Sequence, residues 1–382
     1  MGREGLSVPV NTLHKSILFL DSYKIWDIRL QVFSNFQKDD PQVQDSKMKE
    51  FDQIRSMVSG FSRCPDQLNE VFRSDAEILR VGNTTMAISV DTMVDEIDLG
   101  IYTDPGEIGY IAVMSTVADM VACGSNLIGV LVSLELPRTM TQEDVGLLHQ
   151  GIRKGCEVAR TYLLGGDTNW SDRIRVGVVG VGVFETTGPV MRTGIQAGDL
   201  LFVSGKLGGG NANAINSLLL SGRHPERILP RSICDWEKLH ATYSSAGTDT
   251  SDGFFTALYN LGKVNDVNFE LTVPIPDILE PAAATIAADA GVPLPFLLAG
   301  PVGEYELVFT VPRSQKSDLL AAAHKLGLDV IQCGVAMRRA DSGIKLKLHQ
   351  RELPLDALIE AQQEAASDIG KVMDNLFKYD LF

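Results

Sequence analysis

The sequence predicts an α/β (α+β) protein with two domains, and three observations support this fold class. The chain has 382 residues, which is enough for two domains of ordinary size. Short apolar, β-branched runs alternate with longer segments of helical character. Glycine and proline gather between Thr186 and Gly198, and the pattern restarts after them. We therefore expect an N-terminal extension of unknown role over residues 1–48, one domain over 49–188 and a C-terminal α/β domain over 189–382.

A hairpin opens the pattern of the first domain. Two β-branched runs, 77–81 and 85–90, flank the turn signal Gly82-Asn83. Asp104 followed by Pro105 predicts a helix that runs to about residue 122 and stops at Gly124. Thr141, with Asp144 three residues later, resembles a capping box and predicts a second helix to about residue 160. Apolar runs predict further strands at 127–136, 162–164 and 174–184.

The second domain again mixes strands and helices. The same signals predict strands at 200–204, 268–273, 305–312 and 330–335. They predict helices at 211–220, 253–264 and 314–326, and a long closing helix at 355–377.

Composition excludes several classes of function. The net charge of −15 should repel polyanions, and no basic patch is visible, so we expect no nucleic-acid partner. The five cysteines form no CxxC pair, which favours reduced thiols over a zinc site or disulfides. No apolar run is long enough to span a bilayer, and no signal peptide is visible, so we expect a cytoplasmic protein without a membrane partner.

Aspartates recur at the ends of predicted elements in apolar surroundings. A carboxylate inside an apolar helix, such as Asp119, is costly to bury without a cation or several donors. Mg²⁺ prefers oxygen ligands and commonly bridges carboxylates and phosphates. Any one of these aspartates could instead be a turn residue, a helix cap or a surface residue. The set comprises Asp75, Asp91, Asp119, Asp167, Asp249 and Asp252.

Seven motifs occur in order over residues 50–340 and together resemble one family. They are Glu50–Ile54, Ala87–Val94, Ala118–Gly124, Gly165–Thr168, the stretch Arg192–Gly205, Asp249–Gly253 and Glu304–Phe309. In this order they resemble the motifs of thiamine-monophosphate kinase, a family of the aminoimidazole-ribonucleotide-synthetase (PurM-like) superfamily. Gly165-Gly166-Asp167-Thr168 matches the family's Gly-Gly-Asp-Thr directly.

The resemblance implies a fold, a partner and a chemistry. It implies a two-domain PurM-like fold whose N-terminal domains pair in a homodimer, with ATP bound in a cleft beside the interface. It implies Mg²⁺ held on the ATP phosphates by the six aspartates, and phosphoryl transfer, which depends on metals and positioning more than on a strong base. We expect Asp252 and Asp119 to be catalytic. The expected cofactor-binding residues are Asp75, Thr92, Gly165, Gly166, Asp167, Thr168, Ser251 and Lys206.

Lys206 belongs to a glycine-rich segment, 204–211, that follows a predicted strand. This segment could cradle a phosphate with its backbone N–H groups, or it could be a tight strand-to-helix turn.

The chain also departs from the family pattern. Ser74 stands where the family has an acid, and Pro301-Val302-Gly303 stands where the family has Gly-Gly-Glu. The family's C-terminal aromatic motif is absent. Since these changes fall mainly on the acceptor side, we expect a Mg²⁺-dependent ATP-using kinase for a small metabolite with an altered acceptor pocket. The alternatives are another ATP-dependent synthetase or dehydratase of the superfamily, and a non-catalytic nucleotide-binding homologue, which Ser74 and Gly303 favour.

Overall fold

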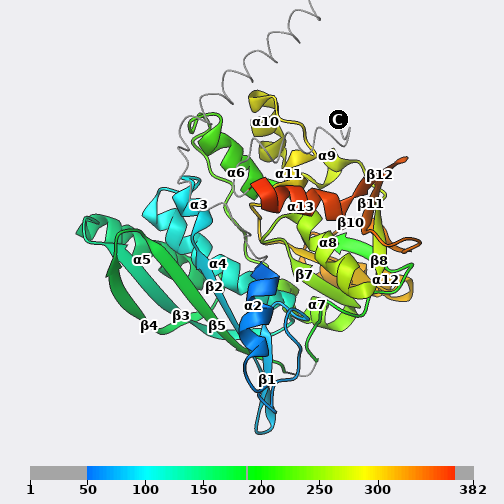
Figure 1. The fold of residues 1–382 in the computed structure, drawn as a ribbon, viewed down its shortest axis with the longest axis horizontal. Helices are drawn as coiled ribbons and strands as arrows, with labels where there is room; N and C mark the ends of the chain where they lie inside the picture. Colours follow the sequence, from blue (N-terminus) through cyan, green and yellow to red (C-terminus); the bar gives the residue numbers. More distant parts are fainter. Residues whose placement is uncertain (1–49, 186–187, 366–382) are drawn as a thin grey trace, which may run out of the picture. The chain divides into compact units, whose positions relative to one another are not determined.

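The computed structural model describes residues 50–185 and 188–365 (Figure 1). The described residues from 54 onward belong to one compact unit that holds two β-sheets. The expected N-terminal extension, 1–48, lies outside the described residues. In the described part of the chain, no helix combines the length and apolar content needed to cross a bilayer.

The first sheet has five strands in the order β1-β2-β5-β3-β4. Only β3 and β4 pair in parallel; the other neighbours are antiparallel. The strands are β1 (Glu77–Val81), β2 (Thr84–Met93), β3 (Asn126–Pro137), β4 (Tyr162–Ser171) and β5 (Arg175–Val183). The hairpin predicted at Gly82-Asn83 is confirmed as β1–β2.

Helices α4 (Pro105–Ala122) and α5 (Gln142–Val158) cover one face of this sheet (Figure 1). Both predicted starts are confirmed. Asp104 caps α4 by accepting from the Glu107 N–H, and Thr141 and Asp144 form a reciprocal capping box on α5. The short helices α2 (Glu50–Ser59) and α3 (Asp95–Asp98) complete this half of the described chain.

The second sheet has seven strands in the order β12-β11-β8-β10-β6-β9-β7. Its centre is aromatic: the Phe202 and Phe309 rings stack with centroids 5.8 Å apart, and Trp236 packs on Phe309. The strands are β6 (Leu200–Val203), β7 (Ala246–Asp249), β8 (Val267–Leu271), β9 (Leu307–Val311), β10 (Ile331–Arg338), β11 (Lys345–Leu348) and β12 (Arg351–Pro354).

Helices surround this second sheet (Figure 1). They are α6 (Gly209–Leu218), α7 (Glu237–Tyr243), α8 (Phe254–Asn265), α9 (Ile275–Ile278), α10 (Pro281–Ala290), α11 (Phe296–Ala299), α12 (Lys316–Leu326) and α13 (Leu355–Ala365), with 3₁₀ turns η1 (Cys234–Trp236) and η2 (Arg313–Gln315). Residues 366–377 of the predicted closing helix lie outside the described residues. The mixed α/β fold class is confirmed, whereas the division into domains at 188/189 stays a prediction.

One expected strand was too short, and several elements of the structure were not predicted. The strand expected at 162–164 continues as β4 to Ser171, because it pairs with β3 across a bulge at Val130/Leu131. The sequence analysis missed β7, a four-residue strand buried along its whole length and therefore without alternation. It also missed the alanine-rich helix α10.

Candidate functional site

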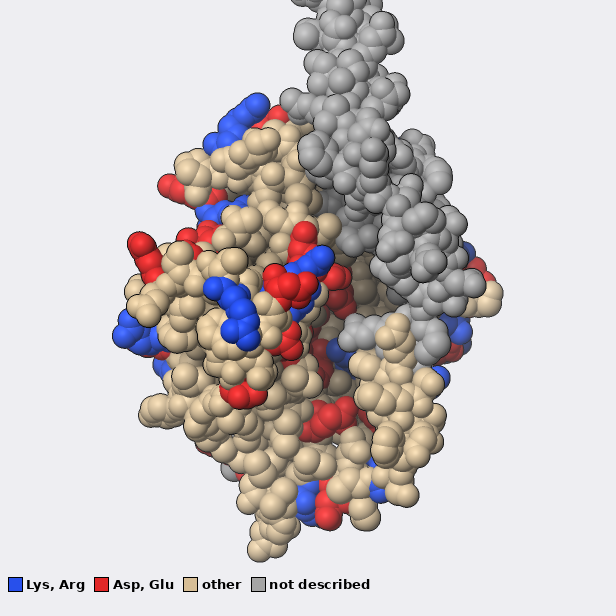
Figure 2. Space-filling model, turned by 60° about the vertical axis from the view of Figure 1, so that its left-hand side comes forward, with Lys and Arg blue, Asp and Glu red and all other residues tan. Residues whose placement is uncertain are grey.

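Three of the six predicted aspartates converge. One carboxylate oxygen from each of Asp75, Asp119 and Asp249 lies within 4.8 Å of the others. Asp75 precedes β1, Asp119 lies in the last turns of α4, and Asp249 ends β7. The cluster therefore joins the first sheet to the second. Figure 2 shows acidic side chains gathered in and beside a hollow on one face of the molecule.

Neighbouring hydroxyl groups hold each carboxylate in place. Ser89 of β2 donates to Oδ2 of Asp119. Ser251 donates to Oδ1 of Asp249 at 2.9 Å. These bonds fix one oxygen of each carboxylate and orient the other.

The Asp75 side chain is almost fully enclosed, with 1% of it exposed. Its Oδ1 accepts from the Thr248 hydroxyl and from the Arg192 guanidinium, the latter at 2.8 Å. Its Oδ2 is buried and has no hydrogen-bond partner, and the same is true of Oδ2 of Asp249. Two orphaned carboxylate oxygens beside a third carboxylate are an oxygen-rich set suited to a hard cation.

The electrostatics show how unfavourable the cluster is without a counter-charge. Burial, and then the charges of Asp249, Asp91 and Asp75, raise the pKa of Asp119 well above its ordinary value. Burial and the charge of Asp75 raise the pKa of Asp249 to about 8. Like charges held this close resist ionisation unless a cation compensates them.

Asp91 and Asp252 lie at the margin of the cluster. Asp91 is half-buried on the same face of β2 as Ser89, and its charge acts on Asp119. Asp252 is exposed, and its charge acts on Asp249. Thr92, after Asp91, is exposed, and its backbone N–H donates to Asp91 Oδ1 at 2.8 Å.

The Gly165-Gly166-Asp167-Thr168 motif lies apart from the three-aspartate group, inside the edge strand β4. Asp167 and Thr168 are exposed, and Asn169 donates to Asp167 Oδ2 at 2.8 Å. At Gly166 a Cβ would lie 2.0 Å from the Val132 carbonyl oxygen, so any side chain there would clash with β3.

The glycine-rich segment leads into α6. The Lys206 ammonium donates to the Asp277 carbonyl, and the Gly208 N–H donates to the Glu304 carboxylate at 2.9 Å. Glu304 therefore holds the backbone of Gly208, the residue before α6. Its pKa is raised to about 8, mainly by burial. Lys206, Glu304 and Arg231 line a cavity of about 360 Å³ beside this loop.

The structure shows what surrounds Ser74 and Gly303, which are two of the departures from the family pattern. Ser74 is buried, and its hydroxyl donates to the Val190 carbonyl at 3.4 Å. Gly303 packs so closely that a Cβ would lie 1.9 Å from the Thr250 carbonyl oxygen. No side chain fits at position 303 without moving the segment that follows Asp249.

Sequence reasoning missed several residues of the site. Arg192 was noticed only as part of a motif, and Ser89 and Thr248 carried no signal as hydroxyl donors.

Glu96 was also missed; burial raises its pKa, and the charges of Asp91, Asp95 and Asp252 raise it further. Tyr305 is buried with a φ of 61°, a strained angle for a tyrosine. Burial, and then the charges of Glu96 and Asp91, raise the pKa of its hydroxyl.

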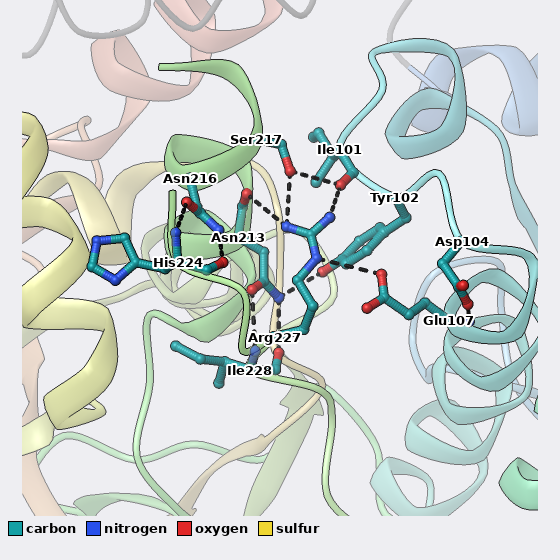
Figure 3. Close-up of polar contacts among 10 residues, drawn as sticks. All are labelled: Ile101, Tyr102, Asp104, Glu107, Asn213, Asn216, Ser217, His224, Arg227 and Ile228. Atoms are coloured by element: carbon teal, nitrogen blue, oxygen red, sulfur yellow. Dashed lines mark hydrogen bonds and ion pairs between the residues drawn. The ribbon is translucent and has the colours of Figure 1, made fainter. Parts of the chain in front are cut away.

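A polar network around Arg227 fixes α4 against α6 (Figure 3). The Arg227 guanidinium donates to the Ile101 carbonyl and to the Ser217 hydroxyl, pairs with Glu107 at 3.4 Å and lies 5.4 Å from the centre of the Tyr102 ring. Asn213 of α6 donates to the Tyr102 hydroxyl at 3.1 Å. Because α4 carries Asp119, this network helps to position the cluster.

Comparisons with known proteins agree with the fold and the motifs. Residues 73–184 match the family described as AIR synthase related protein, N-terminal domain. The chain has the fold of the AIR synthase related (PurM-like) superfamily, as the motifs predicted.

Within that superfamily the chain is similar to thiamine-monophosphate kinases. It is 27% identical to the thiamine-monophosphate kinase of Archaeoglobus fulgidus over 281 residues, which cover 70% of this chain and 88% of that protein. The structure of AaThiL complexed with AMPPCP and TMP superposes with a TM-score of 0.64 at 22% identity, covering 81% of this chain and 99% of that chain. The Escherichia coli hydrogenase maturation protein HypE superposes with a TM-score of 0.59 at 20% identity, covering 79% of this chain and 96% of that chain.

Proposed function

We propose that this chain is a Mg²⁺-dependent, ATP-using kinase that phosphorylates a small metabolite. The observation that carries the proposal is the buried cluster Asp75, Asp119 and Asp249, with two carboxylate oxygens that lack partners. The similarity to thiamine-monophosphate kinases and the AMPPCP complex of a protein with the same fold support ATP as the donor.

In this proposal the three clustered aspartates are the primary metal ligands. Asp91 lies close enough to interact electrostatically with Asp119, and Asp252 with Asp249. In this proposal, Asp91 and Asp252 would hold further metal ions. Bound Mg²⁺ would neutralise the phosphate charges during phosphoryl transfer. The residues of the chain hold the carboxylates, through Ser89 and Ser251, and keep the site partly closed to water. The roles proposed for Asp167, Thr92, Gly165, Gly166, Thr168 and Lys206 in binding ATP rest on the motifs.

A screen of small metabolites for Mg²⁺-dependent ADP formation tests the reaction. Calorimetry with ATP, with and without EDTA, tests the metal requirement. We expect ATP to bind only with the divalent cation, because an acidic cluster repels free ATP. Equal affinity under both conditions would contradict the proposal.

The acceptor pocket is proposed to differ from that of thiamine-monophosphate kinases. Gly303 has no room for the acid that the family carries there, while Pro301 fixes φ and removes an N–H. A pocket whose polar groups change should discriminate against the old ligand by several kcal/mol. A coupled assay with thiamine monophosphate should therefore show little or no product. Efficient formation of thiamine diphosphate would show that the loop matters less than proposed.

We also propose a homodimer formed through the open face of the first sheet. Val90 and Leu131 lie in one row across β2, β5 and β3, through Val179, and Val90 is 70% exposed. Leu131 is 39% exposed on the same face. Apolar side chains gathered on one sheet in this way are typical of a protein interface. Light scattering at micromolar concentration should give the mass of a dimer.

A further inference from the structure

Arg192 brings a positive charge into the aspartate cluster. Its Nη2 donates to Asp75 Oδ1 at 2.8 Å, and its Nε donates to the Thr248 hydroxyl at 3.2 Å. The Arg192 side chain is 19% exposed and that of Asp75 is 1% exposed, so water screens this ion pair poorly.

Hydrogen bonds hold the backbone of Arg192 on both sides. Its N–H donates to the Arg73 carbonyl at 2.8 Å, and its own carbonyl accepts from Asn265 at 2.7 Å. Asn265 also accepts from the Gly194 and Ile195 N–H groups. A change in the position of the guanidinium would therefore be a side-chain movement about a fixed anchor.

The geometry places the guanidinium and a metal ion in competition. A cation bound between Asp75, Asp119 and Asp249 would lie within a few ångströms of the Arg192 guanidinium, because both would contact the same carboxylate of Asp75. Two positive charges at that separation repel strongly where water is scarce. A guanidinium also satisfies a carboxylate well, so it is an effective stand-in for a metal.

We propose that Arg192 is the resident counter-ion of the metal-free cluster and that a divalent metal binds by displacing its guanidinium from Asp75. Arg192 then has two opposite effects. It stabilises the metal-free protein, because it compensates a buried carboxylate. It weakens the binding of metal alone, because a cation that approaches the free Oδ2 of Asp75 is repelled by the guanidinium on Oδ1 until that ion pair breaks. This inference rests on the metal site of the proposed function.

Calorimetry with Mn²⁺ alone, without nucleotide, tests the inference on the full chain. We expect Arg192→Gln to bind Mn²⁺ about tenfold more tightly than the parent, as the loss of a competing ion pair would allow. Arg192→Lys keeps a cation and should stay close to the parent. Arg160→Gln is the matched control: it removes the same charge from an exposed pair with Asp235 and should leave the affinity unchanged.

Thermal unfolding gives the second readout. In EDTA, Arg192→Gln should unfold at a lower temperature than the parent, because Asp75 is left buried without a counter-charge. Added Mn²⁺ should close that gap. If the variant does not fold, the Arg192 Nε–H resonance of the parent, assigned with Arg192→Lys, should change on Mg²⁺ addition as the bond to Thr248 breaks.

The outcomes separate this inference from the proposed function. If Arg192→Gln binds Mn²⁺ no more tightly than the parent, while Asp119→Asn abolishes binding, the metal site stands and the competition is wrong. An Arg192 Nε–H resonance that does not change when metal binds would likewise mean that the competition is wrong. If neither the parent nor Arg192→Gln binds Mn²⁺, both ideas fail.

Discussion

Asp119 and Asp167 belong to motifs that resemble the same family, yet they lie in opposite environments. Asp119 sits in a closed region where α4, β7 and the segment before β1 bring three carboxylates together around a guanidinium. Asp167 stands exposed on β4, the open edge of the first sheet. The closed region has its counter-charge and hydrogen-bond donors within one chain. The open region lacks such an enclosure, so a role in ATP binding there requires the ligand or a second subunit to complete it.

The largest expected effect comes from removing one charge in each region. We expect Asp119→Asn and Asp167→Asn each to lower turnover by orders of magnitude with the fold intact, since both substitutions conserve shape. The metal-free stability should separate them. Asp119→Asn should raise the unfolding temperature in EDTA because it removes a buried charge and relieves repulsion from Asp249, Asp91 and Asp75, whereas Asp167→Asn should leave it unchanged.

Steady-state kinetics and thermal unfolding in EDTA measure these two quantities on the same samples. Turnover within about threefold of the parent, roughly 0.7 kcal/mol of barrier, would mean that the substituted aspartate is structural.

The next effect concerns the open face. Replacing Val90 of β2 and Leu131 of β3 together with serine removes two exposed apolar side chains from that face, each worth about 1.5–3 kcal/mol when buried, and a symmetric interface loses them twice. We expect dimers to dissociate, as measured by sedimentation at several concentrations, while Mn²⁺ binding at the closed cluster persists. Exposed Arg173, at the end of the same sheet, offers a control position for substitution. An unchanged dimer mass would mean that the interface lies on another surface of the protein.

The closed region depends on the network in Figure 3 to hold α4 against α6. Arg227→Gln leaves Glu107 without its charge partner and removes the contact with the Tyr102 ring. Losing the charged hydrogen-bond partner of this half-buried pair costs about 1.5–3 kcal/mol. Urea unfolding should show a loss of this size, against about 0–1 kcal/mol for the exposed pair broken in Arg160→Gln. Equal losses would mean that the network adds no more than a surface ion pair.

Local signals in the sequence predicted the parts of the fold that are local in origin. Asp104 and Thr141 lie at helix starts because a cap needs only neighbouring residues, and the Gly82-Asn83 turn needs only its two strands. The strand β7 left no pattern, since four residues buried on both faces do not alternate. The continuation of β4 depends on pairing with β3, which lies far away in sequence.

The same distinction applies to the site. Residue type and motif order identified six aspartates, but nothing local shows that Asp75, Asp119 and Asp249 meet, because they come from a loop, a helix and an unpredicted strand. The role of Arg192 depends on where the segment after the first sheet crosses back to Asp75. Long-range packing decides such contacts, and a single sequence does not display it.

His240 tests how firmly the closed region is packed. Its Nε2 lies 2.9 Å from the carbonyl oxygen of Ala122, the last residue of α4, so Nε2 carries the proton, and Nδ1 accepts from Ser244 at 2.7 Å. Burial lowers the pKa of His240 to about 4 from its ordinary 6.5. Between these two pH values His240 binds a proton in the unfolded chain but not in the folded chain. The contribution of neutral His240 to the free energy of unfolding is therefore complete above pH 6.5 and is lost as the pH falls towards 4.

This loss should reach roughly 3 kcal/mol, which is the shift converted at about 1.4 kcal/mol per pH unit. His240→Gln removes the titrating ring, so its free energy of unfolding should fall less steeply than that of the parent over this range. Urea unfolding at several pH values measures both curves, and the carboxylates shared by both proteins cancel in the difference. Parallel curves would mean that water reaches His240, and that the α4 end of the closed region opens more readily than its burial indicates.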